Sequence, residues 1–84
     1  MKIEAYYVSI SQRSYVPYMH GRAFGGITRK NKPTPSEIRD LRSHVAKQYN
    51  LSPINVVVDI EPTKCSEAYC IGGTLVEAYE SLAA

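Results

Sequence analysis

The residues best suited to chemistry in this chain are basic and aromatic side chains that alternate between positions 13 and 32. This stretch holds five basic residues and no acidic one. Phosphates attract positive charge, and unstacked bases pack on flat rings or guanidinium planes. The stretch therefore predicts a surface for nucleic acid, above all a single-stranded or deformed one. The candidate binding residues are Arg13, Tyr15, Tyr18, His20, Arg22, Phe24, Arg29, Lys30 and Lys32, extended by Arg39 and Arg42 in the next segment.

Two other interpretations of residues 13–32 stay open. The same basic surface suits an acidic protein surface, in which case the chain is an inhibitor or adaptor that docks on a larger complex. A phage or mobile-element accessory protein that blocks a host defence complex is one example of that class. Alternatively, the stretch is a solvated basic loop whose rings turn inward and cap the core, because no fingerprint of a nucleic-acid-binding module is present.

The glycines of residues 21–26 resemble a phosphate-binding loop only superficially. The segment lacks the G-x-G-x-x-G spacing and the Gly-Lys-Ser/Thr ending, and no helix is expected directly after it. These glycines are therefore predicted to form turns or to allow close packing.

Four side chains offer thiol or imidazole chemistry, namely Cys65, Cys70, His20 and His44. The C-x4-C spacing falls within a loose zinc range, but the two histidines lack the paired spacing of a structural zinc site. Two cysteines are also too few for a disulfide scaffold. We expect no metal, no disulfide bridge and no cofactor.

Catalysis is not expected from this sequence. A Cys/His nucleophile pair can be written down, but no nucleophile elbow, HExxH motif or distinctive carboxylate pair accompanies it. A chain of 84 residues also leaves little room for an enclosing pocket. Asp59 and Glu61, two apart on an expected strand, most simply mark where that strand meets solvent.

The clearest structural element is a helix over residues 35–49. Thr34 and Glu37 form a capping box around Pro35 at the first helical position, and Asn50 suits a left-handed stop. A second capping-box pattern, Thr74 to Glu77, predicts a short C-terminal helix over about 75–83. The apolar stripe of the main helix consists of Ile38, Leu41, Val45 and Tyr49.

Strands are expected at about 3–10, 20–28 and 55–60, the first of them central because apolar residues occupy both faces. Residues 11–33 fit either a hairpin or a long loop. The fold class is thus α+β: a small two-layer single domain with a three-stranded sheet on one main helix. The expected core consists of Ile3, Ala5, Tyr7, Val8, Ile38, Leu41, Val45, Leu51, Val56, Val58, Ile60, Leu75, Tyr79 and Leu82.

The net charge of +2 hides an asymmetry along the chain. Residues 11–50 contain eight basic and two acidic side chains, whereas residues 51–84 contain one basic and five acidic ones. Such a chain can fold with one end that attracts anions. No apolar run suits a membrane span or a signal peptide, so we expect a cytoplasmic monomer or small homo-oligomer.

Overall fold

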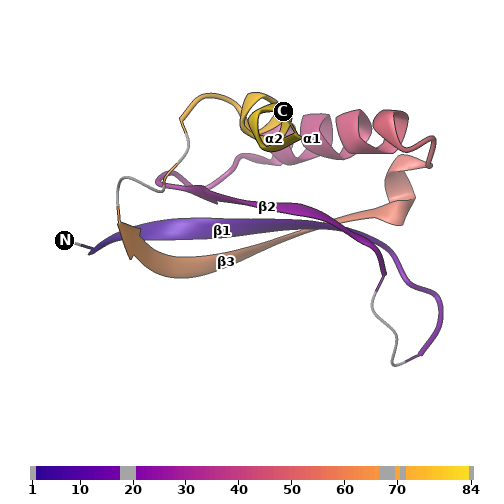
Figure 1. The fold of residues 1–84 in the computed structure, drawn as a ribbon, viewed down its shortest axis with the longest axis horizontal. Coiled ribbons are helices and arrows are strands. Elements are labelled where there is room, and N and C mark those ends of the chain that lie inside the picture. The colour runs from indigo at the N-terminus through magenta and orange to yellow at the C-terminus, as the bar shows by residue number, and fades with distance from the viewer. Residues whose placement is uncertain (1, 18–20, 67–69, 71, 84) are drawn as a thin grey trace.

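The computed structural model describes residues 2–17, 21–66, 70 and 72–83. Figure 1 shows a three-stranded sheet with two helices packed on one of its faces. The predicted α+β architecture is confirmed. The elements in chain order are β1 (Lys2–Gln12), β2 (Ala23–Arg29), α1 (Pro35–Gln48), the short 3-10 helix η1 (Pro53–Asn55), β3 (Val56–Ser66) and α2 (Leu75–Ala83).

β1 is the central strand, as predicted, in the order β2-β1-β3. Both neighbours run antiparallel to it, so β2 and β3 are parallel to each other and α1 connects them. Val8 pairs with Ile27 on one side and with Ile60 on the other. Because directly paired residues point to the same face, this register places one row of apolar side chains beneath the helices.

β2 forms a hairpin with β1, whereas residues 13–17 and 21–22 belong to the connection and form no strand, so residues 11–33 are neither a hairpin by themselves nor one long loop. β2 begins at Ala23, later than expected, and the Gln12 amide donates to the Arg22 carbonyl at 2.7 Å just before it. A Cβ on Gly21 would lie 1.8 Å from the Gln12 carbonyl oxygen, so this glycine permits a close backbone approach, as predicted.

β3 ends six residues beyond the expected strand end, because it continues through Pro62 to Ser66. The prediction placed a strand end before Pro62 because proline cannot donate to a sheet ladder. However, β3 is an edge strand and Pro62 pairs with Tyr6 without a break in register. The missing amide therefore belongs on the unpaired side, where an edge strand tolerates proline.

α1 has the predicted ends. The Glu37 amide donates to the Thr34 hydroxyl at 3.2 Å, and the Glu37 carboxylate accepts from the Thr34 amide at 3.3 Å. At the other end Asn50 has a φ of 57°, and the Leu51 amide donates to the Ala46 carbonyl at 2.7 Å. This arrangement is a Schellman motif, which satisfies the last carbonyls of the helix.

Thr34→Ala is expected to lower the free energy of unfolding by about 0.5–2 kcal/mol, because it removes the acceptor of the Glu37 amide. Urea denaturation of the variant and the wild type measures the difference. An unchanged denaturation midpoint would contradict a stabilising role for this cap.

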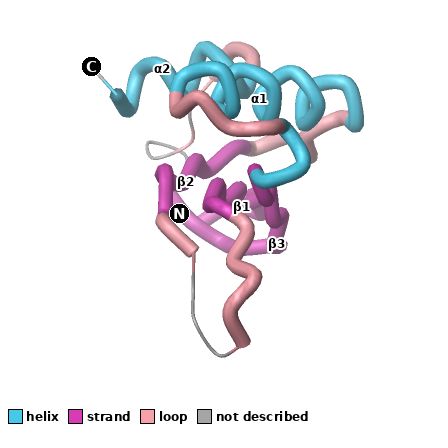
Figure 2. Tube along the Cα trace, turned by 90° about the vertical axis from the view of Figure 1, so that its right-hand side faces the viewer, coloured by secondary structure: helices cyan, strands magenta, loops and turns pink. Residues whose placement is uncertain are grey.

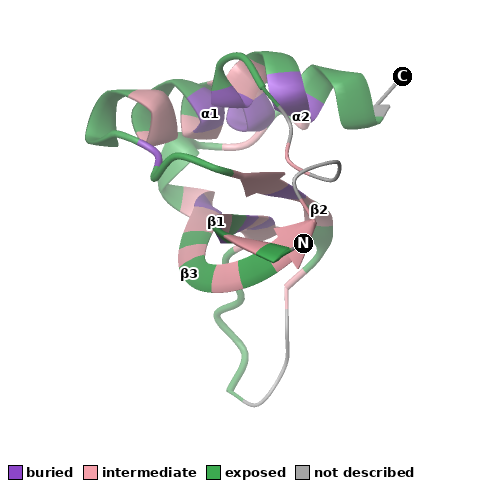
Figure 3. Cartoon of the chain, turned by 90° about the vertical axis from the view of Figure 1, so that its left-hand side faces the viewer, coloured by how far each residue is buried: buried purple, intermediate pink, exposed green. Residues whose placement is uncertain are grey.

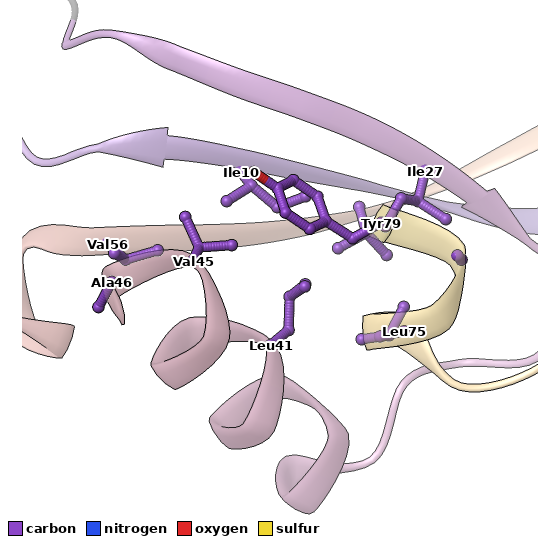
Figure 4. Packing of buried hydrophobic residues seen from close by; sticks show 10 residues of the cluster. Ile10, Ile27, Leu41, Val45, Ala46, Val56, Leu75 and Tyr79 are labelled. Carbon is purple, nitrogen blue, oxygen red and sulfur yellow. The ribbon is translucent and has the colours of Figure 1, made fainter. Parts of the chain in front are cut away.

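The core lies between the sheet and the two helices (Figure 4). Most members of the expected core are buried or half-buried there, and the second helix closes one side of the cluster. The expected list omitted four core members, namely Ile10, Ile27, Ala46 and Ala78. The buried cluster consists of Val8, Ile10, Ile27, Leu41, Val45, Ala46, Val56, Leu75, Ala78 and Tyr79.

Four residues of the expected core neither belong to this cluster nor are among the half-buried residues packed against it. Ile3 and Tyr7 share the face of β1 that carries Ser9, and no helix covers that face; Tyr7 is 42% exposed (Figure 3). Leu82 near the end of α2 is 48% exposed. Ala5 lies on the same uncovered face but is buried among its neighbours, at 2% exposure.

Candidate partner-binding surface

The structure divides the predicted binding residues between two ends of the sheet. Residues 13–17 and 21–22 lie before β2, at the right of Figure 1, and residues 30–32 lie after it, at the left. A strand of seven residues spans about 20 Å, which separates the two groups. The basic stretch is therefore not one continuous surface.

The first group belongs to what we call the hairpin end, formed by residues 13–17, 21–24 and 47–55. Residues 13–17, which follow β1, extend here on the side away from the helices (Figure 2). Hydrogen bonds tie it to η1: the Arg13 amide donates to the Asn55 carbonyl at 2.7 Å, and Arg13 Nε donates to the Ile54 carbonyl at 2.9 Å. The Tyr15 hydroxyl donates to Asn55 Oδ1 at 2.6 Å.

Three large apolar side chains are exposed to solvent at the hairpin end. Tyr15 is 74% exposed, Val16 56% and Ile54 67%. The Tyr15 hydroxyl bonds to Asn55 and the Arg13 guanidinium to the Ile54 carbonyl, so residues 13–15 lie beside η1 although they are far from it in sequence. Isolated exposed apolar residues are ordinary, but a group of them is typical of an interaction surface.

All charged side chains at the hairpin end are basic. Arg13, Arg22 and Lys47 are exposed. Residues 11–36 and 41–58, which include all segments of this end, contain no acidic side chain. An acidic partner would be attracted to this end.

Arg22 and Phe24 at the start of β2 pack on Tyr49 at the end of α1. The Phe24 and Tyr49 rings are stacked with centroids 4.3 Å apart. The Arg22 guanidinium lies 4.9 Å from the Tyr49 centroid and 5.8 Å from that of Phe24. Both distances fall within the range of a cation–π contact. The guanidinium therefore lies beside both stacked rings, not as a third layer on the outer face of one of them.

The Phe24–Tyr49 ring pair also contacts the hydrophobic core. Phe24 and Tyr49 pack against the buried cluster, which includes Tyr79. Burial raises the pKa of the Tyr79 phenol to about 12, and the adjacent Tyr49 hydroxyl adds to the rise. Phe24 is therefore a ring that turns inward and caps the core, as the solvated-loop interpretation expected of the rings in this stretch.

Arg29 was expected to be a binding residue, but its side chain is largely covered. Its guanidinium pairs with the Glu37 carboxylate at 2.5 Å, and its side chain is only 12% exposed. The Arg29 hydrogen bond lowers the pKa of Glu37, and the Thr34 amide lowers it further. Arg29 thus joins the end of β2 to the first turn of α1 and is a structural residue.

The other predicted cations do not extend the hairpin end. Lys30 and Lys32 are exposed beyond β2, and Arg39 is exposed on the second turn of α1. Arg42 is half-buried in the middle of α1, and its Nε has no hydrogen-bond partner within the described part of the chain. Tyr18 and His20 lie outside the described residues.

Sequence reasoning missed Val16 and Ile54 as members of this surface. One signal was present for Ile54, since an isolated apolar residue follows Pro53 in a turn, where no helix or strand buries it. Nothing in the sequence indicated that η1 lies beside Tyr15.

No protein-family model, curated protein or solved structure matches this chain. The assignment of a function therefore depends on the geometry of the site.

The described imidazole lies apart from the thiols. His44 lies in the helical layer, edge-on to Tyr79 and 3.6 Å from the Glu80 carboxylate. Cys65 pairs with Ile3 at the end of the sheet. Among residues 2–17, 21–66, 70 and 72–83, no three histidine, cysteine or acidic side chains gather as a metal site would require.

An open hollow of about 320 Å³ lies at the other end of the sheet, away from the hairpin end. It is lined by the paired segments Glu4–Tyr6 and Pro62–Lys64, so none of the predicted binding residues borders it. Of the helices in the described part of the chain, none is both long enough and apolar enough to span a bilayer.

Proposed function

We propose that this chain is a non-catalytic binding module that docks on another protein through its hairpin end. One observation carries the proposal: Tyr15, Val16 and Ile54 are exposed at the hairpin end, where Arg13 and Tyr15 both bond to η1. Interfaces derive most of their affinity from a few anchors, among which Tyr and Arg are enriched. The all-cationic surroundings favour a partner with an acidic rim around an apolar pocket.

A protein partner fits this surface better than nucleic acid does. Base binding needs free ring faces, but Phe24 is stacked on Tyr49 and covered by Arg22. A phosphate backbone needs a row of cations, but the basic stretch is divided between the two ends of β2. Bare aliphatic groups such as Ile54 gain more from burial in an apolar pocket than from contact with a phosphate.

The hairpin end is also organised before binding. The Tyr15 hydroxyl is anchored on Asn55, and Arg13 is anchored through both its backbone and its side chain. Residues that are already held lose less conformational freedom on docking, which leaves more of the contact energy as affinity.

Ile54→Asp tests the proposal, because it places a negative charge at an exposed apolar position of the hairpin end without touching the core. Tagged wild-type and variant proteins are used to capture partners from an extract of the native host after nuclease treatment. The captured protein is then titrated with each form. A lost anchor of about 2 kcal/mol corresponds to about 30-fold weaker binding. The melting temperature should stay close to that of the wild type, since Ile54 is exposed.

Leu82→Asp is the matched control, because Leu82 is also exposed but lies on α2. It is expected to bind as the wild type does. If a protein partner is still captured after nuclease treatment and binds the Ile54→Asp variant as tightly as the wild type, docking at the hairpin end is refuted. Capture that nuclease abolishes, with oligonucleotide binding that falls steeply with salt, would assign the surface to nucleic acid instead.

A further inference from the structure

The two thiols of the chain meet at the end of β3. Cys65 Sγ lies 3.6 Å from Cys70 Sγ. Both thiols also approach one backbone oxygen, the Ser66 carbonyl, at 3.4 Å from Cys65 and 3.9 Å from Cys70. Both side chains are half-buried. The sequence interpretation expected no bridge here, and the spacing alone could not show that the sulfurs are neighbours.

The separation is close to that of a bonded pair. A disulfide needs the sulfurs at about 2.0 Å, so they must approach by about 1.6 Å, which small side-chain rotations supply. Partial exposure leaves a path for a small oxidant, whereas fully buried thiols are inert.

We propose that Cys65 and Cys70 form a reversible intramolecular disulfide by exchange with a small-molecule disulfide such as oxidised glutathione. In the first step one cysteine thiolate attacks the glutathione disulfide, forms a mixed disulfide and releases one glutathione thiolate. In the second step the other cysteine thiolate attacks the protein sulfur of the mixed disulfide and releases the second glutathione. The protein loses two electrons and two protons, which the two released glutathione molecules carry.

The bridge would tie the end of β3 to the segment that leads into α2. Cys65 is held in the sheet by its pairing with Ile3, whereas Cys70 lies in the connection before Leu75, which enters the core. A cross-link across this connection removes freedom from the unfolded chain. We expect the oxidised protein to melt at a higher temperature than the reduced protein.

Peptide mass analysis of the intact chain tests the bridge. Purified protein is equilibrated in glutathione buffers of increasing oxidised fraction, the remaining thiols are alkylated, and trypsin is added. No lysine or arginine follows Lys64, so both cysteines fall in one peptide, residues 65–84. The bridge predicts that this peptide loses the mass of two hydrogen atoms, takes up no alkylating agent and yields no fragments from cleavage between the cysteines.

Cys65→Ser and Cys70→Ser are the matched controls. Each single variant is expected to stop at the mixed disulfide with glutathione, and the double variant is expected to melt as the reduced wild type does in every buffer. Wild-type protein that retains glutathione, forms disulfide-linked dimers or keeps both thiols in the most oxidising buffer would overturn the proposal. An oxidised form that melts below the reduced form would overturn the stabilising role assigned to the bridge.

Discussion

Arg29→Glu is expected to lower the free energy of unfolding by about 2–4 kcal/mol, because it leaves a carboxylate facing Glu37 in a half-buried site. The Arg29 side chain is 12% exposed and that of Glu37 24%, so water compensates little for the lost pair. Glu37 is also the acceptor of the Thr34 amide in the capping box, and repulsion there disturbs the start of α1. Urea denaturation at neutral pH measures the loss.

Lys32→Glu is the control for this variant. It makes the same change of charge a few residues later, at an exposed position, and is expected to change stability by no more than about 0.5 kcal/mol. Equal effects of the two substitutions would contradict a structural role for Arg29.

The pair also links stability to pH. The Arg29 hydrogen bond lowers the pKa of Glu37 below its ordinary value of 4.5. Because the pKa of Glu37 is lower in the folded state than in the unfolded state, the ionised carboxylate stabilises the fold at pH values above its ordinary pKa. This stabilisation is lost as the pH falls through the lowered pKa of the folded state. The stability difference between wild type and Arg29→Met should therefore shrink on acidification. A difference independent of pH would contradict this linkage.

Leu75→Ala is expected to lower the free energy of unfolding by about 2–5 kcal/mol, the usual cost of a cavity at a fully buried leucine. Leu75 is the first residue of α2 and is completely buried against the core cluster. The total free energy of unfolding of a small domain is only about 5–15 kcal/mol, so this loss is a large fraction of it. Urea denaturation followed by circular dichroism measures it.

Leu82→Ala on the same helix separates burial from helix propensity. Both changes replace leucine by the best helix former, but Leu82 is 48% exposed and leaves no cavity. We expect Leu82→Ala to change the free energy of unfolding by no more than about 0.5 kcal/mol. Equal and small effects of both substitutions would show that α2 does not complete the core.

Local signals in the sequence were sufficient for the helices. The capping box at Thr34 and Glu37, the second threonine cap at Thr74 and the left-handed Asn50 all depend on residues within one helical turn. Their hydrogen bonds can therefore be predicted without knowing what the helix packs against. The central place of β1 followed from its apolar run in the same way.

Features that depend on neighbouring strands were harder to predict. The length of β3 depends on its edge position, because only there is the missing amide of Pro62 tolerated. The choice of core face in β1 depends on which side the helices cover, and Ile3 and Tyr7 are as apolar as Val8 and Ile10. Hydrophobicity alone does not say which of two apolar faces will be covered.

The sequence by itself determined the helices, the number of strands, the central β1 and the charge asymmetry, since each is a property of composition or of contacts within a few residues. Only the tertiary structure decided which side chains form a surface. It removed Arg29 by pairing it with Glu37, turned Phe24 onto Tyr49, and brought η1 beside residues 13–15. The physical reason is that chain reversal and sheet pairing join residues as far apart as Tyr15 and Asn55, and no local pattern encodes which distant segments will meet.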